Sequence, residues 1–112
     1  MNSRAKGIRG EKEWADWLAQ NADCQLACRS GLNYVKAGVD VQFGIPGTRA
    51  EVKRVQTLNV SKAVFRAVAD AKPDEIPYVA HRRNKEPWLV TLRAEDLVRF
   101  CFLVVANVQE EK

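Results

Sequence analysis

The chain contains few of the residues from which disulfide frameworks, zinc clusters and membrane spans are built. It has three cysteines and one histidine, and no apolar run is long enough to cross a bilayer. Cys24 and Cys28 have no second pair of metal-ligating residues near them, and the histidine, His81, is far away in sequence, which argues against a structural zinc site. Because nothing at the N-terminus resembles a signal peptide, we expect reduced thiols in a cytoplasmic protein.

Acidic residues are fewer than basic ones. The chain has 14 aspartates and glutamates and 18 lysines and arginines, which gives a formal net charge of +4 and favours anionic partners. The basic residues gather in three segments, which comprise Arg4, Lys6, Arg9 and Lys12; Arg49, Lys53 and Arg54; and residues 81–85. Such segments suit a phosphate backbone, although a solvated surface explains any one of them equally well. At 112 residues, without repeats, low-complexity segments or linkers, the chain is expected to form one domain, 1–112. Residues 1–6 are expected to be a basic, flexible tail.

The most informative stretch runs from Asp40 to Lys53 and is typical of a β-hairpin. Two alternating runs flank the turn residues 45–47. If the turn closes symmetrically, Asp40 lies directly opposite Glu51, with Cβ atoms roughly 4.5–5.5 Å apart. Two carboxylates this close need a cation between them, and Lys53 shares the strand face of Glu51 by the two-residue period. The hairpin therefore predicts a divalent-metal site beside an ammonium that could position a water.

A second candidate carboxylate lies on the expected helix 7–20. Trp14 and Leu18 define the apolar sector of this helix, and Glu11 falls inside that sector whereas Glu13 falls outside it. A carboxylate on the core-facing stripe is costly to bury without a partner. Glu11 could therefore point at the sheet and join Asp40 and Glu51 around the metal. The alternative is a boundary residue near the start of the helix, where the helix dipole favours an anion.

The remaining elements complete an α/β pattern. We expect a strand at 24–30, a helix from Asn59 to about Lys72 with its apolar stripe at Val60, Val64, Phe65, Val68 and Ala71, an antiparallel pair at 77–83 and 88–92, and a helix from Ala94. Periodicity alone leaves 102–105 open between helix and strand, and this much apolar surface hints at a dimer contact. The order is helix, three strands, helix, two strands, helix, which is typical of a mixed sheet with helices packed on it.

Several motifs together resemble a known family. The run Lys6-Gly7-Ile8-Arg9-Gly10-Glu11-Lys12-Glu13 is similar to the Lys-Gly-x-x-x-Glu-x-Glu opening of archaeal junction resolvases, and Arg29-Ser30, Val39-Asp40-Val41 and Glu51-Val52-Lys53 match their later motifs in order. Residues 76–84 and 88–92 are similar to small phage and prophage endonucleases. The chain thus resembles the Holliday-junction-resolvase-like branch of the PD-(D/E)xK nuclease superfamily. Val39 replaces the proline of that name, and loop 31–38 does not align.

The resemblance implies a fold and a metal-dependent reaction. The fold would be α/β, a restriction-endonuclease-like mixed β-sheet of about five strands flanked by helices, in the order αβββαββα. Mg²⁺, for which Mn²⁺ could substitute, would be bound by Asp40, Glu51, the Val52 carbonyl and Glu11, while Lys53 would position the attacking water. Hard oxygen ligands suit this metal, and no organic cofactor is implied.

The resemblance also implies a DNA substrate, with a branched four-way junction cut by a homodimer in a bacterial or phage-infected cell. The candidate DNA-binding residues are Lys6, Arg9, Arg29, Ser30, Arg49, Arg54, Lys62, Arg82 and Arg83, and Gln56 could orient Lys53 or a metal-bound water. Three alternatives remain open. The chain could be a repair- or restriction-like nuclease of duplex DNA, or a non-catalytic nucleic-acid-binding module. Alternatively, Asp40, Glu51 and Lys53 could form a surface ion cluster on an unrelated α/β domain.

Overall fold

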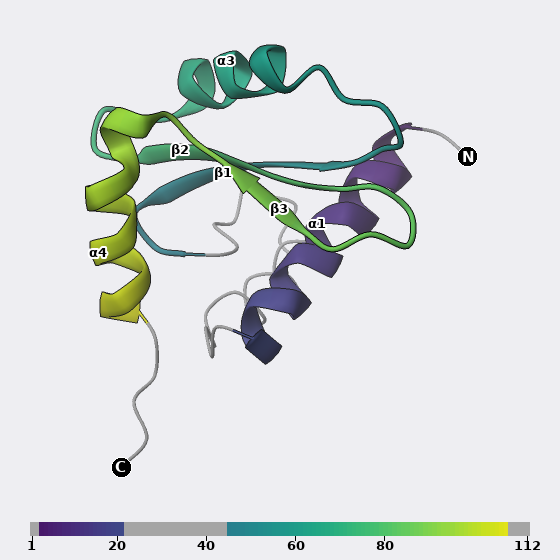
Figure 1. Cartoon of the computed structure of the whole chain (residues 1–112), viewed down its shortest axis with the longest axis horizontal. Helices are drawn as coiled ribbons and strands as arrows, with labels where there is room; N and C mark the ends of the chain where they lie inside the picture. The colour runs from purple at the N-terminus through teal and green to yellow at the C-terminus, as the bar shows by residue number, and fades with distance from the viewer. Residues whose placement is uncertain (1–2, 22–44, 108–112) are drawn as a thin grey trace.

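The computed structural model describes residues 3–21 and 45–107, which form a compact α/β domain (Figure 1). Its elements are α1 (Ser3–Asn21), β1 (Thr48–Arg54), α3 (Val60–Asp70), β2 (Ile76–Arg82), β3 (Leu89–Thr91), a short 3-10 turn η1 (Ala94–Asp96) and α4 (Leu97–Asn107). Within these residues the order is αβαββα with three strands, and not the predicted αβββαββα with about five. The predicted strand 24–30 and the first strand of the predicted hairpin lie outside the described residues.

The sheet is mixed and has the strand order β1-β2-β3. Strand β1 pairs in parallel with β2, and this register places Glu51 beside Val79 and Lys53 beside His81. Helix α3 makes the crossover that two parallel strands require. Strands β2 and β3 form the predicted antiparallel pair, joined through a turn in which Lys85 has a φ of 62°. Strand β1 therefore has one described neighbour, β2, which comes from much later in the chain.

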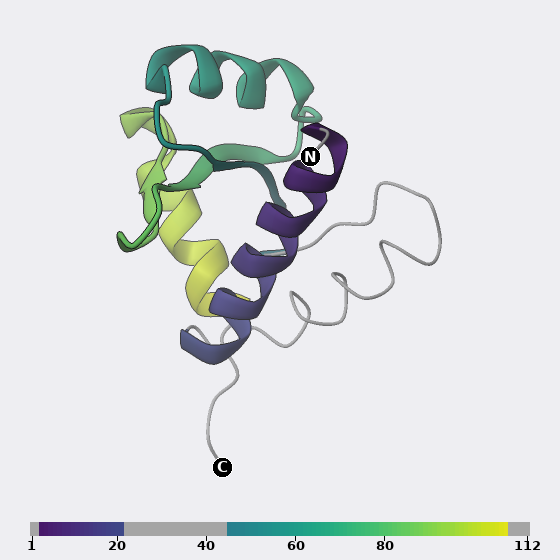
Figure 2. The ribbon, with the colours of Figure 1, turned by 90° about the vertical axis from the view of Figure 1, so that its right-hand side faces the viewer.

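Helices cover both faces of this sheet: α1 and α4 lie on one side and α3 lies on the other (Figures 1 and 2). On the α1 side, Trp14, Leu18 and Tyr78 form the core, with Ala50 and Val52 of β1 packed against it. On the α3 side, the core is smaller and consists of Ala63 and Ala67 packed on Val79. Because side chains alternate along a strand, β1 presents Ala50 and Val52 to one face and its odd-numbered residues to the other.

Two helix boundaries explain how these layers are held. Helix α1 begins at Ser3, several residues before the predicted start, so part of the expected tail is helical. Gly10 allows α1 to approach β1 closely, because a Cβ atom there would lie 3.1 Å from the Cβ of Arg54. Helix α3 begins where predicted: the Asn59 side chain accepts a hydrogen bond from the backbone N–H of Lys62 over 3.0 Å and caps the helix.

The buried stripe of α3 differs from the prediction. Phe65 is 75% exposed, and the helix buries the small residues Ala63 and Ala67 in its place. Small side chains let α3 lie close to Val79 at the centre of the sheet.

In α4, residues 102–105 are helical, which decides between the helix and the strand that periodicity left open. None of the helices in the described ranges is long and apolar enough to cross a membrane.

Candidate functional site

Glu51 and Lys53 lie two residues apart on β1 and form an ion pair on the face that α3 covers. Their Oε2 and Nζ atoms are 3.3 Å apart, and the side chains are 18% and 33% exposed respectively. The carboxylate is therefore shielded on one side while it still reaches solvent. This pair places a carboxylate and an ammonium on the same face of one strand, as the two-residue period predicts.

Glu11 approaches β1 from the other face. It is half-buried on α1, next to Gly10, whose neighbours across the interface are Val52 and Arg54. The helix therefore packs on the side of β1 opposite Glu51. No group of three or more histidines, cysteines, aspartates or glutamates gathers into a metal site within residues 3–21 and 45–107. Asp40, the remaining predicted ligand, lies outside the described residues.

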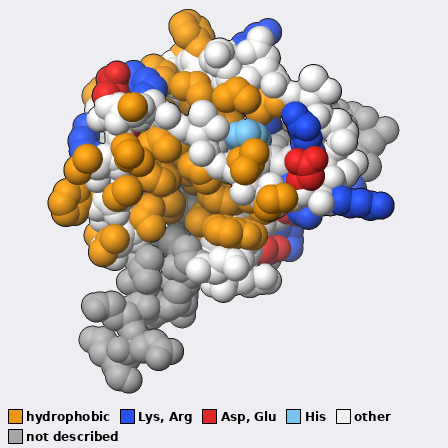
Figure 3. Space-filling view, in the orientation of Figure 1, with side chains coloured by type: hydrophobic (Ala, Val, Ile, Leu, Met, Phe, Trp, Pro, Cys, Tyr) orange, Lys and Arg blue, Asp and Glu red, His pale blue; other side chains and the backbone are white. Residues whose placement is uncertain are grey.

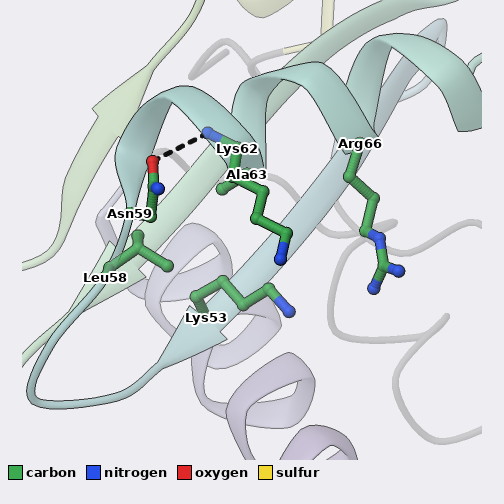
Figure 4. Close-up of a pocket in the computed structure, with 6 residues that line it drawn as sticks. All are labelled: Lys53, Leu58, Asn59, Lys62, Ala63 and Arg66. Carbon is green, nitrogen blue, oxygen red and sulfur yellow. Dashed lines mark hydrogen bonds between the residues drawn. The ribbon is translucent and has the colours of Figure 1, made fainter.

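An open pocket of about 270 Å³ lies between β1 and α3, next to the Glu51–Lys53 pair. It is lined by Lys53 of β1 and by Leu58, Asn59, Lys62, Ala63 and Arg66 at the start of α3 (Figure 4). Three of these six residues are cationic and none is acidic. The ammonium ends of Lys53 and Lys62 and the guanidinium of Arg66 all extend into the space between the helix and the strand. We call this feature the cationic pocket.

Arg66 is the cationic residue of the pocket that the predicted site residues do not include. The signal for it exists, because Lys62 and Arg66 are four residues apart and therefore lie on the same face of α3, away from the buried Ala63 and Ala67. Sequence spacing cannot show that this face lies over Lys53. That juxtaposition comes from the parallel β1-α3-β2 crossover.

Three of the predicted DNA-binding arginines are held in ion pairs within the domain. Arg54 Nε lies 3.0 Å from Glu13 Oε1, and Arg82 Nη1 lies 3.7 Å from the same oxygen. Glu13 thus ties α1 to two strands and neutralises part of the charge expected to meet DNA. Arg49 Nε similarly lies 3.1 Å from Glu75 Oε1.

The other predicted site residues are exposed to solvent or have side chains outside the described part of the chain. Arg9, Lys62 and Arg83 are exposed. The side chains of Lys6, Arg29 and Ser30 lie outside the described part of the chain. The side-chain oxygen of Gln56 accepts a hydrogen bond from the backbone N–H of Asn84 over 2.6 Å, which links the end of β1 to the turn between β2 and β3.

Two titratable groups near these residues have shifted pKa values. Burial acts to raise the pKa of Glu75, but hydrogen bonds from the Lys72 backbone and the Arg49 guanidinium outweigh it, so the pKa lies below its ordinary value. Burial, and then the positive charge of Arg83, lower the pKa of His81. The His81 ring is also held in place, because its Nε2 lies 2.9 Å from Thr91 Oγ1. We therefore expect a neutral imidazole beside Lys53 at neutral pH.

The described geometry thus combines a carboxylate–ammonium pair with a cationic pocket on one face of β1. Such an arrangement can neutralise and orient an anionic group at the α3 side of the sheet. No protein-family model, no curated protein and no solved structure matches this chain.

Proposed function

We propose that this chain is a metal-dependent DNA endonuclease that hydrolyses phosphodiester bonds, with a branched four-way junction as its substrate. The observation that carries the proposal is the Glu51–Lys53 pair, an acidic ligand and an ammonium 3.3 Å apart, beside a pocket lined by three cations. A phosphodiester is an anion whose hydrolysis develops further negative charge, so this surface suits both the substrate and its transition state. A restriction-endonuclease-like sheet is the finer fold that we propose for the whole chain.

The donor chemistry fits a hard divalent cation. Glu51 supplies carboxylate oxygens, which Mg²⁺ and Mn²⁺ prefer, and we propose Asp40 and the Val52 carbonyl as its companions. Because α1 packs on the opposite side of β1, we propose that Glu11 completes the metal shell through a water and not by direct contact. When bound, such a metal lowers the pKa of a coordinated water and stabilises charge on the phosphoryl oxygens. Lys53 orients the attacking water by hydrogen bonding and neutralises charge that develops on the phosphate. Glu51 holds the Lys53 ammonium in position through their ion pair.

A homodimer is part of the proposal, because one junction presents two strands to be cut. Apolar side chains are exposed over α4 and β3 (Figure 3). On α4 they include Leu97, Val98, Phe102 and Val105, which are half or more exposed and recur at helical spacing. An exposed stripe of this kind is typical of a protein–protein contact. We place the proposed dimer contact here.

The test is a nicking assay on a labelled four-way junction beside a matched linear duplex, with Mg²⁺ and with EDTA. We expect wild type to cleave the junction only when Mg²⁺ is present. Asp40→Asn, Glu51→Gln and Lys53→Ala should each lower the rate roughly 10²–10³-fold, the scale for removing one group that stabilises a transition state. Glu95→Gln, which removes an exposed carboxylate, is the matched control and should cleave like wild type.

The alternatives give distinct results in the same assay. Equal cleavage of junction and duplex would replace the resolvase by a general nuclease with the same site. Tight binding without cleavage in Mg²⁺ or Mn²⁺ would replace it by a DNA-binding module. In the nuclease, Glu51→Gln should keep or improve DNA affinity while it loses cleavage, because a negative charge has left the binding surface.

A further inference from the structure

The cationic pocket is lined by three positively charged side chains and, among the described residues, by no negatively charged one. Lys53 is paired with Glu51, whereas Lys62 and Arg66 have no ion-pair partner among the described residues. Like charges gathered at one site repel one another, and this repulsion is stronger at the lower effective dielectric of a protein surface than in water. An anion in the pocket removes this repulsion and replaces it by attraction.

The start of α3 adds to the positive potential. Asn59 caps the helix and lines the pocket, and Lys62 and Ala63 follow in the first turn. The N-terminal end of a helix carries a partial positive charge from its aligned peptide dipoles. Leu58 and Ala63 supply an apolar lining beside the cations. An apolar wall has a low dielectric constant and therefore concentrates the field of the neighbouring charges on an anion.

The size and openness of the pocket select the kind of anion. Its volume of about 270 Å³ is below the roughly 300–1,000 Å³ of sites that enclose a drug-sized ligand. Its three cations come from an open face between a strand and a helix and do not surround an enclosed cavity (Figure 4). One phosphodiester of an extended strand fits such a site better than a whole nucleotide.

We propose that Lys62 and Arg66, together with Lys53, bind a backbone phosphate of the DNA strand that lies across β1. The identification of the anion as DNA rests on the proposed function, whereas the anion site itself rests on the geometry of the pocket. Lys53 belongs both to this site and to the Glu51 pair. The bound phosphate is therefore the reacting phosphate or one next to it, and Lys62 and Arg66 set the position of the strand. They are positioning residues.

Binding is measured by fluorescence anisotropy with a labelled junction in EDTA, where cleavage does not occur. Lys62→Ala and Arg66→Ala should each weaken binding roughly 3- to 10-fold, and the double variant should weaken it roughly 10- to 100-fold. The magnitude of the slope of log K against log salt should fall by about 1 in the double variant, because the remaining cation, Lys53, is already paired with Glu51 and no longer suffices to neutralise the phosphate. Arg99→Ala, which removes an exposed arginine from α4 on the other face of the sheet, is the matched control and should change affinity less than about 2-fold.

A second variant separates loss of charge from loss of structure. Asn59→Asp keeps a good capping residue and adds a carboxylate to the pocket. We expect its thermal stability to equal or exceed that of wild type and its DNA affinity to fall. Retention of wild-type affinity and salt slope in the double variant would overturn the proposal. Full displacement of the junction by micromolar inorganic phosphate would also overturn it, because the pocket would then prefer a free anion.

The two proposals can fail separately. If wild type cleaves junctions while the double variant binds them normally, the phosphate site is wrong and the nuclease stands. If the double variant loses DNA binding while wild type cleaves nothing with Mg²⁺ or Mn²⁺, the phosphate site stands and the nuclease is wrong.

Discussion

The hydrogen bond between α1 and β2 should be a measurable part of the stability of the domain. Trp14 Nε1 donates to the Tyr78 hydroxyl over 2.9 Å, and these side chains are 2% and 1% exposed. Tyr78→Phe removes the acceptor and leaves a buried indole N–H unpaired, which should lower the free energy of unfolding by about 1–3 kcal/mol. At about 2.1 cal/mol/K of unfolding entropy per residue, 112 residues give roughly 0.24 kcal/mol/K. The expected decrease in Tm is therefore about 4–13 °C.

Intrinsic fluorescence is a suitable assay, because Trp14 lies 5.3 Å from Trp17 and 5.2 Å from Trp88 between ring centroids. Unfolding should separate these rings and change their emission. Phe65→Ala is the control for a surface truncation and should change stability by less than about 0.5 kcal/mol. In the Trp14→Phe background, Tyr78→Phe should cost roughly 1 kcal/mol less than in wild type. Equal costs in both backgrounds would refute the coupling between these side chains.

Two further predictions concern the sheet. Because the pKa of His81 is lowered in the folded state, the unfolded state binds more protons between that value and 6.5. Stability should therefore fall as pH decreases through this window. In urea unfolding at pH 5, 6 and 7, the free energy of unfolding should depend less on pH for His81→Asn than for wild type. The same pH dependence in both proteins would contradict this prediction. Gly10→Ala should lower the Tm although alanine has the better helix propensity. The new Cβ atom would lie 3.1 Å from the Cβ of Arg54, which belongs to a paired strand. A higher Tm in a thermal scan would show instead that α1 can shift to make room.

Local chemistry made several features of this protein predictable. Asn59 before an apolar run marks the start of α3, because its side chain can cap the helix. The turn between β2 and β3 is likewise readable from Asn84-Lys85-Glu86-Pro87 between two β-rich runs. Glu51 and Lys53 share a face because side chains alternate along any strand. These features depend on residues that are close in sequence.

Pairing between distant segments was not predictable in the same way. No local pattern shows that β1 pairs in parallel with β2, so no local pattern places Lys62 and Arg66 over Lys53. The same holds for Glu13, which the helical wheel assigns to the charged side of α1 and which the tertiary structure pairs with Arg54 and Arg82.

The sequence by itself determined which residues could supply a carboxylate ligand, an ammonium group and a helix cap, since those properties belong to the side chains and their nearest neighbours. The tertiary structure decided which charges are neutralised within the domain and which remain available to a partner. The physical reason is that Coulomb interactions depend on distance in space. In this domain, packing of the helices on the sheet brings Glu13 to Arg54 and leaves Lys62 and Arg66 without an ion-pair partner among the described residues of the pocket.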